Sequence, residues 1–570
     1  MTYSLTRYVL LIAAVFMSWR TADAGAQPTL QQFKAWLIYY TNNDIRADYN
    51  YDGRVTPTDF NAFLVNYNNP PTNTGWTDLT PSSDSRIIYV SSSQGNDSND
   101  GRTQSRPVKT IQKAYDLVRD GKPDWVSLRR GDTFYESIPN WKKSGRSKSE
   151  PMVITAYGTT TSRPKILTGS SRGMRATGPE FRKHIYFVGL EFRPHTRTRS
   201  DTPGGIEFIC DFQDILIEDC KISGYADNLQ FQAPKGDMGT DVRVRRSVIT
   251  DSWAVGRHSQ GLYAARVDGL LLEGNVFDHN GWNTSVDGGE PTIFNHNIYI
   301  QNNCGTLTVR DNIISNASSH GLQARPGGTI TGNLFYRNAI SVLLGHEEDQ
   351  TTGRIEDNVI LEGKDIAPDL RRGMGIHVQN VDGAKIRNNV ILRNGTDTGL
   401  SEAIALIGDD NQPITNLLVE YNVIYNWLNN VVIENESTRD MIFRFNVVYD
   451  SQNESPVMRH FDDSTLNDVL SYNNTYFVSG TSNWFRARNN YYNLTQWLNV
   501  SNESDPISIN GRSFVDPTRT LTRYAQYQLL PADPTLVINR AKAQNRLNWD
   551  DAYSAPAIVE FFKAGYTLTN

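Results

Sequence analysis

The feature that most constrains this chain is a short phrase that recurs from about residue 180 onward. In each copy, alternating apolar residues lead to an asparagine, and two apolar or β-branched residues follow it. Successive asparagines lie 21 to 37 residues apart, and repetition at such a period is typical of a solenoid. The repeated asparagines are Asn275, Asn312, Asn333, Asn358, Asn389, Asn422, Asn446 and, in a degraded copy, Asn474.

The segments between these asparagines predict coils of one to three short strands. They alternate with turns of Gly, Asn and Asp, and no helix-length segment separates them. An inward asparagine at the same corner of every coil can hydrogen-bond to its own turn and to the coils above and below. Burial then leaves its polar groups satisfied, which explains why the asparagine repeats while its neighbours vary.

A second strand can be aligned in each coil, and its alternation divides the side chains into two rows. A period of two places one row inward, against the shared core, and the other row outward. The inward row contains Leu262, Ile298, Leu322, Val342, Ile376 and Ile404. The outward row contains Tyr263, Tyr299, Gln323, Leu343, His377 and Ala405.

The segment before the repeat resembles a known group of proteins. Tyr89 to Asp97, followed by Pro107 to Ala114, looks like the first coil of secreted bacterial right-handed β-helix proteins related to pectate lyases. The resemblance covers about residues 86 to 500 and implies an all-β fold, a right-handed parallel β-helix. It also implies that Thr110 to Arg119 form an amphipathic helix over the open end. The superfamily includes lyases, glycosidases, epimerases and proteins without assigned activity.

The first residues predict export. Arg7 supplies a positive charge, Tyr8 to Met17 are apolar, and Ala24-Gly25-Ala26 offers small residues for cleavage, so residues 1–26 are interpreted as a signal peptide of a secreted protein. The alternative is a membrane anchor, but this apolar run is shorter than the roughly 20 residues that span a bilayer. No later segment approaches that length, and we expect no membrane span.

Residues 27–69 predict a small calcium-binding module. Oxygen-bearing side chains at loop positions 1, 3, 5 and 12, with glycine at position 6, suit a Ca²⁺ ion. Apolar residues at helical spacing flank the loop, which resembles a dockerin loop and implies a cohesin-like or cell-surface partner. Dockerins normally carry two loops, whereas this chain has one. The predicted metal-site residues are Asp48, Asn50, Asp52, Arg54 and Asp59.

The remaining divisions follow from composition. Residues 70–85 are rich in Asn, Pro and Thr and are interpreted as a linker, residues 86–515 as the β-helix, and residues 516–570 as a helical tail. Helical patterning covers Leu521 to Tyr527, Thr535 to Arg546 and Ala555 to Tyr566, and the tail is interpreted as a cap or an attachment tag.

Charge and cysteine content narrow the possible partners. The net charge of −6 is spread over interspersed residues, so nothing predicts nucleic-acid binding, and a solenoid that buries its core in one chain predicts a monomer. Three cysteines are too few for a disulfide framework. Either Cys210 and Cys220 form one bridge, or all three are buried thiols.

Polar side chains gather in the central coils and suggest β-elimination on an acidic glycan. A lyase needs a cation to neutralise the uronate, a base for the C5 proton and an acid at the leaving oxygen. Arg325 could neutralise, His320 or His346 could be the base, and Tyr299 the acid. Glu347, Glu348 and Asp349 could instead hold a second Ca²⁺. The full candidate set is His320, Arg325, His346, Glu347, Glu290 and His296 as catalytic residues, with Tyr263, Tyr299, Gln323 and His377 binding substrate.

Two alternatives stay open. A glycoside hydrolase needs two carboxylates at a defined separation, which Asp287, Glu290, Glu347 and Glu348 or Asp409 and Asp410 could supply. A non-catalytic carbohydrate-binding or cell-surface protein could use the same groove, because fold does not determine activity. The leading expectation is an extracellular polysaccharide lyase that works in the groove between about residues 260 and 410.

Overall fold

The computed structural model describes residues 40, 55–57, 75–364, 372–393, 402–408, 411–451, 456–479, 483–508 and 513–569. The chain divides into two units between Leu79 and Thr80, and only the second is described at length. The predicted signal peptide lies outside the described residues. So do the calcium-loop positions Asp48, Asn50, Asp52, Arg54 and Asp59, as well as Asp409 and Asp410.

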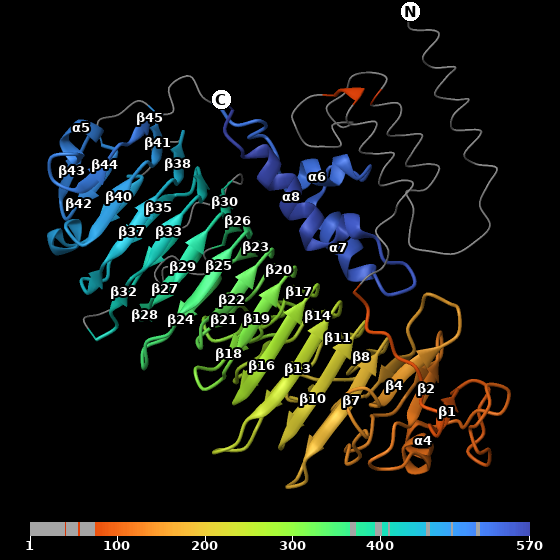
Figure 1. Ribbon diagram of the computed structural model, residues 1–570. Coiled ribbons are helices and arrows are strands. Elements are labelled where there is room, and N and C mark those ends of the chain that lie inside the picture. The colour runs from red at the N-terminus through yellow and green to blue at the C-terminus, as the bar shows by residue number, and fades with distance from the viewer. Residues whose placement is uncertain are drawn as a thin grey trace, which may run out of the picture. The chain divides into compact units, whose positions relative to one another are not determined.

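The second unit is a right-handed parallel β-helix whose coils stack into three long sheets (Figure 1). Sheet A, in spatial order, consists of β1 (Ile87–Val90), β2 (Trp125–Arg129), β4 (Met152–Tyr157), β7 (Arg182–Val188), β10 (Phe212–Glu218), β13 (Gly239–Arg245), β16 (Val267–Glu273), β19 (Leu307–Arg310), β22 (Gly328–Thr331), β25 (Gly353–Glu356), β29 (Lys385–Arg387), β33 (Leu418–Glu420), β37 (Met441–Arg444), β40 (Val469–Tyr472) and β44 (Asn502–Ser504).

Sheet B follows sheet A in every coil. It consists of β3 (Thr133–Phe134), β5 (Lys165–Leu167), β8 (Glu191–Arg193), β11 (Lys221–Ser223), β14 (Val248–Thr250), β17 (Val276–Asp278), β20 (Ile313–Ser315), β23 (Leu334–Asn338), β26 (Val359–Gly363), β30 (Val390–Leu392), β34 (Val423–Tyr425), β38 (Val447–Asp450), β41 (Thr475–Val478) and β45 (Ile507–Ser508).

Sheet C closes each coil and carries the predicted outward row. It consists of β6 (Met174–Thr177), β9 (Gly204–Ile209), β12 (Asp227–Gln232), β15 (Gln260–Ala265), β18 (His296–Ile300), β21 (His320–Ala324), β24 (Ile340–Gly345), β27 (Met374–Gln379), β31 (Glu402–Leu406), β35 (Asn429–Ile433), β39 (Met458–His460), β42 (Phe485–Ala487) and the antiparallel β43 (Asn490–Tyr492). Three shorter strands, β28 (Val381–Asp382), β32 (Ile414–Thr415) and β36 (Thr438–Arg439), form a small fourth sheet.

The asparagine repeat lies at the corner between sheets A and B, as predicted. Asn312 Nδ2 donates to Asn333 Oδ1 at 2.9 Å, and Asn333 Nδ2 donates to Asn358 Oδ1 at 2.9 Å. The ladder continues at the same spacing from Asn275 to Asn474, and every member is buried. Each amide also bonds to backbone groups, so the buried polar atoms of the corner are satisfied.

A second ladder, which the sequence analysis missed, lies at the corner between sheets B and C. Asn228, Asn280, Asn297 and Asn338 form a chain of side-chain hydrogen bonds there, at 2.8 to 3.5 Å. Their spacing in the sequence is irregular because inserted loops separate the coils, so no repeat reveals them.

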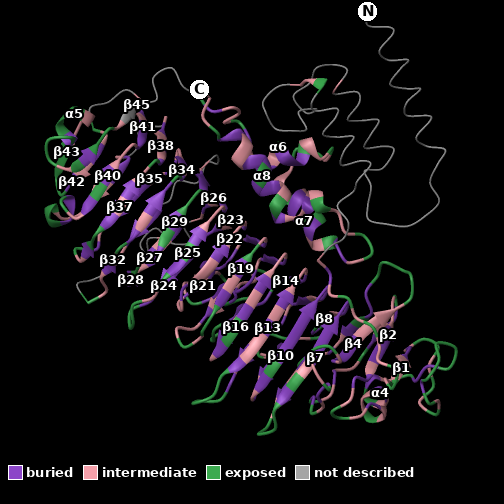
Figure 2. Ribbon diagram, in the orientation of Figure 1, coloured by how far each residue is buried: buried purple, intermediate pink, exposed green. Residues whose placement is uncertain are grey.

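The apolar interior runs the length of the coils, and Figure 2 shows its buried residues along the strands. The predicted inward row from Leu262 to Ile404 lies in register from strand to strand. At the first coil, helix α4 (Ile111–Leu117) begins after its N-cap Thr110 and packs against β1 and β2. This helix is the one that the resemblance implies.

Cys210, Cys220 and Cys304 are free thiols. A bridge between Cys210 and Cys220 was one of two open alternatives, and it is wrong: both side chains are buried, and Cys220 Sγ donates to Phe187 O at 3.4 Å. Burial raises the pKa of Cys210 to about 11 and that of Cys220 to about 12. Both thiols therefore stay protonated at neutral pH.

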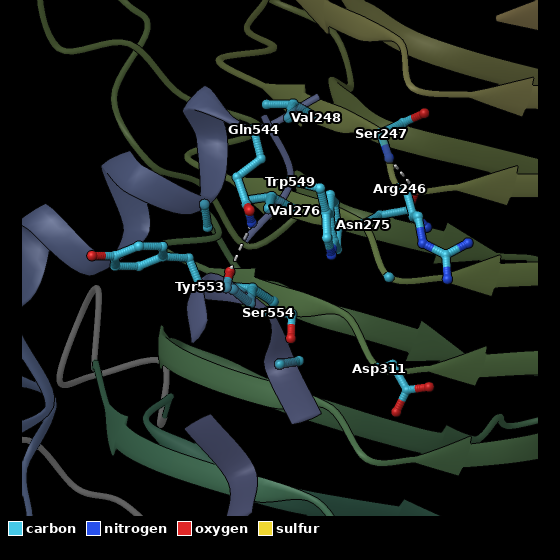
Figure 3. Close-up of a pocket in the computed structure, with 14 residues that line it drawn as sticks. Arg246, Ser247, Val248, Asn275, Val276, Asp311, Gln544, Trp549, Tyr553 and Ser554 are labelled. Carbon is cyan, nitrogen blue, oxygen red and sulfur yellow. Dashed lines mark hydrogen bonds between the residues drawn. The ribbon is translucent and has the colours of Figure 1, made fainter. Parts of the chain in front are cut away.

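The tail lies along the side of the solenoid rather than over its end. After the 3₁₀ turn η3 (Asp463–Leu466) and α5 (Leu494–Trp497), helices α6 (Leu521–Tyr527), α7 (Pro534–Ala543) and α8 (Ala555–Gly565) follow the outer side of sheet B (Figure 1). The 3₁₀ turn η4 (Asp551–Tyr553) joins α7 to α8. Lys542 Nζ pairs with Asp278 at 2.7 Å, and Lys563 Nζ pairs with Asp357 at 2.5 Å. Trp549 and Tyr553 lie beside Val276 of the solenoid in Figure 3. Helix α7 ends three residues earlier than predicted.

We expect Asn333→Ala to lower the free energy of unfolding by about 3 kcal/mol, because it leaves the buried backbone N–H of Asn312 without an acceptor and breaks the side-chain ladder on both sides. Urea denaturation followed by tryptophan fluorescence measures the change. The control is Asn499→Ala, an exposed asparagine outside the ladder, which we expect to have almost no effect. Equal urea midpoints for the two variants would contradict the importance of the ladder.

Candidate active site on the outer face of sheet C

The predicted outward row is present on sheet C. Tyr263 pairs with Tyr299, Tyr299 with Gln323, and the row continues through Leu343 and His377 to Ala405. Two members differ from expectation: Leu343 and Ala405 are buried although they point outward. They form a small apolar cluster with Ile340, Met374 and the partly buried Ile407. Adjoining polar members, Tyr263, Tyr299 and Gln323, therefore lie on the earlier coils, and His377 lies between the two buried members.

His296 and His320 lie on adjacent strands and are hydrogen-bonded to each other. The backbone N–H of His320 donates to His296 Nδ1 at 3.3 Å, so this nitrogen carries a lone pair. The two Nδ1 atoms are 3.1 Å apart, and Ser319 Oγ lies 3.2 Å from His320 Nδ1; a proton on His320 Nδ1 makes the contact between the rings a hydrogen bond. A neutral His320 then has an unprotonated Nε2, which is buried and has no hydrogen-bond partner among the described residues.

Burial keeps both imidazoles neutral. It lowers the pKa of His296 to about 3, and it lowers the pKa of His320 well below 6.5, an effect to which His296 and His377 add. The ring of His296 also meets the ring of Tyr299 edge-on, with centroids 5.2 Å apart. Two neutral imidazoles therefore lie beside the outward Tyr299.

Arg325 lies next to Tyr299 and is held by neutral groups. Its Nη1 donates to Tyr299 Oη at 3.0 Å and to Gln301 Oε1 at 3.3 Å. Within the described ranges, no carboxylate lies at ion-pair distance from this guanidinium. Its charge is therefore available to an anionic ligand, and the Tyr299 hydroxyl proton can point away from the arginine.

Several predicted residues do not join this group. His346 is buried, and its Nδ1 accepts the backbone N–H of Glu348 at 3.0 Å, which leaves a proton on Nε2 and makes it a poor base. Burial also lowers the pKa of His346, and Arg325 adds to that effect. Glu347, Glu348 and Asp349 are exposed.

The loop carboxylates Asp287 and Glu290 are exposed as well. Asp287 pairs with Arg199 at 2.5 Å. Within the described part of the chain, no group of three or more His, Cys, Asp or Glu side chains could hold a metal ion. The second Ca²⁺ site in the groove stays a prediction, and no cluster of metal-ligating side chains among the described residues supports it.

The sequence analysis missed a carboxylate pair two coils earlier on the same face. Glu207 is salt-bridged to Arg172 at 2.8 Å, and Asp227 to Arg257 at 3.0 Å. A Cβ on Gly204 would lie 2.4 Å from Glu207 Cδ, so the Glu207 carboxyl group occupies the space over this glycine. Gly204 pairs with Asp227 on the adjacent strand, which brings the two carboxyl groups onto neighbouring rungs.

Burial affects the titration of both acids. It raises the pKa of Asp227 to about 6 against the opposing charge of Arg257, and it raises the pKa of Glu207 against Arg172 and Arg175. A hollow of about 600 Å³ begins beside them, lined by Arg172, Arg175, Asn140 and Thr202 among others. The alignment of sheet C strands in the sequence began at Gly261. Extending it by two coils toward the N-terminus would have placed Glu207 and Asp227 on neighbouring strands.

Part of the repeat region matches a known protein family. A family described as "Right handed beta helix region" matches residues 195–352. A curated lacto-N-biosidase from Bifidobacterium longum subsp. longum is 34% identical over 80 residues, which is 14% of this chain and 5% of the relative. This chain therefore spans a small fraction of that relative's length.

Solved structures are similar to this chain only at low identity and low TM-score. A GH136 lacto-N-biosidase from Eubacterium ramulus is 14% identical with a TM-score of 0.29, over 74% of this chain and 67% of that one. The A-module of a mannuronan C-5 epimerase from Azotobacter vinelandii is 14% identical with a TM-score of 0.40, over 70% and 93%. At these values the likeness concerns the fold alone. No helix in the described ranges is long and apolar enough to cross a membrane.

We expect the free energy of unfolding to decrease as the pH falls from about 6.5 toward about 3. A histidine whose folded-state pKa is depressed takes up a proton only in the unfolded state within this window, so acid favours unfolding. His296→Gln should reduce the loss between pH 7 and pH 5 by about 2 kcal/mol. Urea denaturation at both pH values tests this, and an unchanged loss in the variant would refute the assignment.

Proposed function

We propose that this chain is a carbohydrate-active enzyme that cleaves an acidic glycan by β-elimination on the outer face of sheet C. The observation that carries the proposal is Arg325. Its guanidinium donates to Oη of the outward Tyr299 at 3.0 Å and has no carboxylate partner in the described structure. An arginine that lacks an ion pair beside an outward tyrosine suits the carboxylate of a uronate.

The described side chains can supply each step of the elimination. Arg325 binds the uronate carboxylate and stabilises the negative charge that develops when C5 loses its proton. His320 is the candidate base: its Nε2 is unprotonated in the neutral pair and buried, so it accepts that proton only when glycan binding opens a path to it. The C4–O bond breaks as the C4–C5 double bond forms, and the Tyr299 hydroxyl gives its proton to the leaving oxygen. Tyr263, with its ring centroid 5.6 Å from that of Tyr299, offers apolar contact to the next sugar.

We expect Tyr299→Phe and Arg325→Gln each to lower kcat at least 100-fold, because each removes one group from the elimination. Alginate, pectate, ulvan and sulfated algal glycans are screened by ultraviolet absorbance, which detects the unsaturated product, and by reducing-end release. Matched controls are Tyr491→Phe, an exposed tyrosine on another strand, and Arg354→Gln on sheet A, both of which should keep full activity.

Turnover that survives both Tyr299→Phe and Arg325→Gln would show that the site is elsewhere. If the unsaturated product forms and neither variant is slower, the chain is a lyase but Tyr299 and Arg325 do not catalyse the reaction. Binding of a glycan without either readout would instead favour a carbohydrate-binding protein, which the sequence also allows.

A second candidate is hydrolysis, favoured by the Glu207 and Asp227 pair. Asp227, with its pKa raised to about 6, could protonate the leaving oxygen, while Glu207, held by Arg172, could act as the ionised partner. The same screen separates the two reactions. Reducing ends without absorbance, abolished by Asp227→Asn and retained in Tyr299→Phe, would favour hydrolysis.

We further propose that the chain acts outside the cell after removal of residues 1–26. The loop from Asp48 to Asp59 would bind Ca²⁺, and the module that contains it would attach the enzyme to a cohesin-like or cell-surface partner. The composition of the loop supports this proposal. A monomer that binds an extracellular polysaccharide accords with a core closed within one chain.

A further inference from the structure

A row of left-handed residues lies along the outside of the corner between sheets A and B. The residue before each ladder asparagine has a positive φ, from 53° to 67°. Such a conformation favours Gly, Asn and Asp, and most members of the row are of these types. The row contains Gly274, Asp311, Gly332, Asp357, Asn388, Tyr421, Phe445 and Asn473.

Tyr421 and Phe445 depart from this rule. Both are bulky residues at positive φ, 56° and 53°, where such side chains are rare. Their side chains are nevertheless 46% and 38% exposed, and their rings stack with centroids 5.1 Å apart and planes 5° apart. Bulky residues such as Arg246 and Arg337 also have positive φ in this chain, so what distinguishes Tyr421 and Phe445 is the stacked aromatic surface that they expose on neighbouring coils.

The two rings line a hollow of about 740 Å³ between the corner and helix α8. Its floor is formed by the row itself, from Asp311 to Phe445, together with outward valines of sheet B such as Val423. Pro556, Val559 and Lys563 of α8 form the opposite wall. A hollow of this volume is large enough to hold a small ligand.

Polar groups continue the same row beyond the rings. The Asp311 carboxyl group has no hydrogen-bond donor among the described residues, and burial raises its pKa. Asp357 accepts from Asn388 Nδ2 at 2.5 Å and pairs with Lys563 at 2.5 Å. Asp357, Asn388, Tyr421 and Phe445 come from successive coils, so these hydrogen-bonding groups and the aromatic surface are spaced by one coil, about 4.8 Å.

We propose that this hollow is a binding site for a neutral oligosaccharide, separate from the face that carries the proposed catalysis. A pyranose ring has an apolar C–H side that packs on aromatic surface and hydroxyl groups that donate to carboxylates. The charged lining groups are Asp311, Asp357, Glu560 and Lys563, and Arg387 and Arg444 lie over the rings of Tyr421 and Phe445 at 5.6 and 5.9 Å. Acidic and basic groups therefore balance around the hollow, which suits a neutral glycan. The proposal does not depend on the reaction at sheet C.

The test removes the aromatic surface without disturbing the backbone. Tyr421→Asn with Phe445→Asn introduces the residue type that Asn388 already has in this row, so we expect the double variant to fold with an unchanged or higher melting temperature. The control is Phe181→Asn, another exposed aromatic residue outside both sites. Calorimetric titration uses xylohexaose, cellohexaose and mannohexaose, with oligogalacturonate as the acidic probe.

We expect at least one neutral hexasaccharide to bind the full-length protein and to bind the double variant at least tenfold more weakly, with no change in Phe181→Asn. Failure of all three neutral probes to bind, equal affinity in the double variant, or loss of oligogalacturonate binding alone would overturn the proposal. A dimer of the full-length protein that dissociates in the double variant would show instead that a second copy fills the hollow. Turnover at sheet C should be the same in both proteins, so the two proposals fail separately.

Discussion

The structure depends on the hydrogen-bonded ladder of asparagines at the corner between sheets A and B. A turn that enters a dry interior in every coil would leave backbone and side-chain polar groups without water, at a cost of about 1–3 kcal/mol for each unpaired group. The ladder satisfies these groups by bonding each amide to the next coil, from Asn275 to Asn474. It also fixes the register, because each asparagine must face its counterpart for the bonds to form.

A fixed register determines what the outer surfaces can do. On sheet C it places Tyr299, Gln323 and Arg325 on adjacent rungs, although inserted loops separate the coils in the sequence. At the ladder corner it forces the preceding residue into the left-handed region, and there the chain tolerates two aromatic residues. Sheet B faces the tail, whose Lys542 and Lys563 pair with the solenoid, so on this side the proposed ligand site is confined to the hollow between α8 and the ladder corner.

Much of this fold could be predicted because its signal is periodic. The asparagine spacing and the alternation around Leu262 and Leu322 gave the coils, the inward row and the outward row. The second ladder escaped because Asn228, Asn280, Asn297 and Asn338 share no repeated phrase. The site was predicted only in part. The strand alignment predicted that His296, His320, Tyr299 and Arg325 lie close together. The histidine tautomers, the hydrogen bond that His346 Nδ1 accepts and the position of the Glu207 carboxyl group over Gly204 depend on side-chain conformation, which the alignment does not give.

The most direct measurement of the register is disulfide formation between introduced cysteines, in a Cys304→Ser background. Tyr299→Cys with Gln323→Cys joins partners in register on neighbouring strands, about 4.8 Å apart, within reach of a disulfide. Tyr299→Cys with Arg325→Cys places the thiols two residues out of register, roughly 8 Å apart at Cα and beyond that reach. Peptide mapping after mild oxidation should find the bridge in the first protein alone. A bridge in the second protein but not in the first would contradict the stacking on which both proposed sites rest.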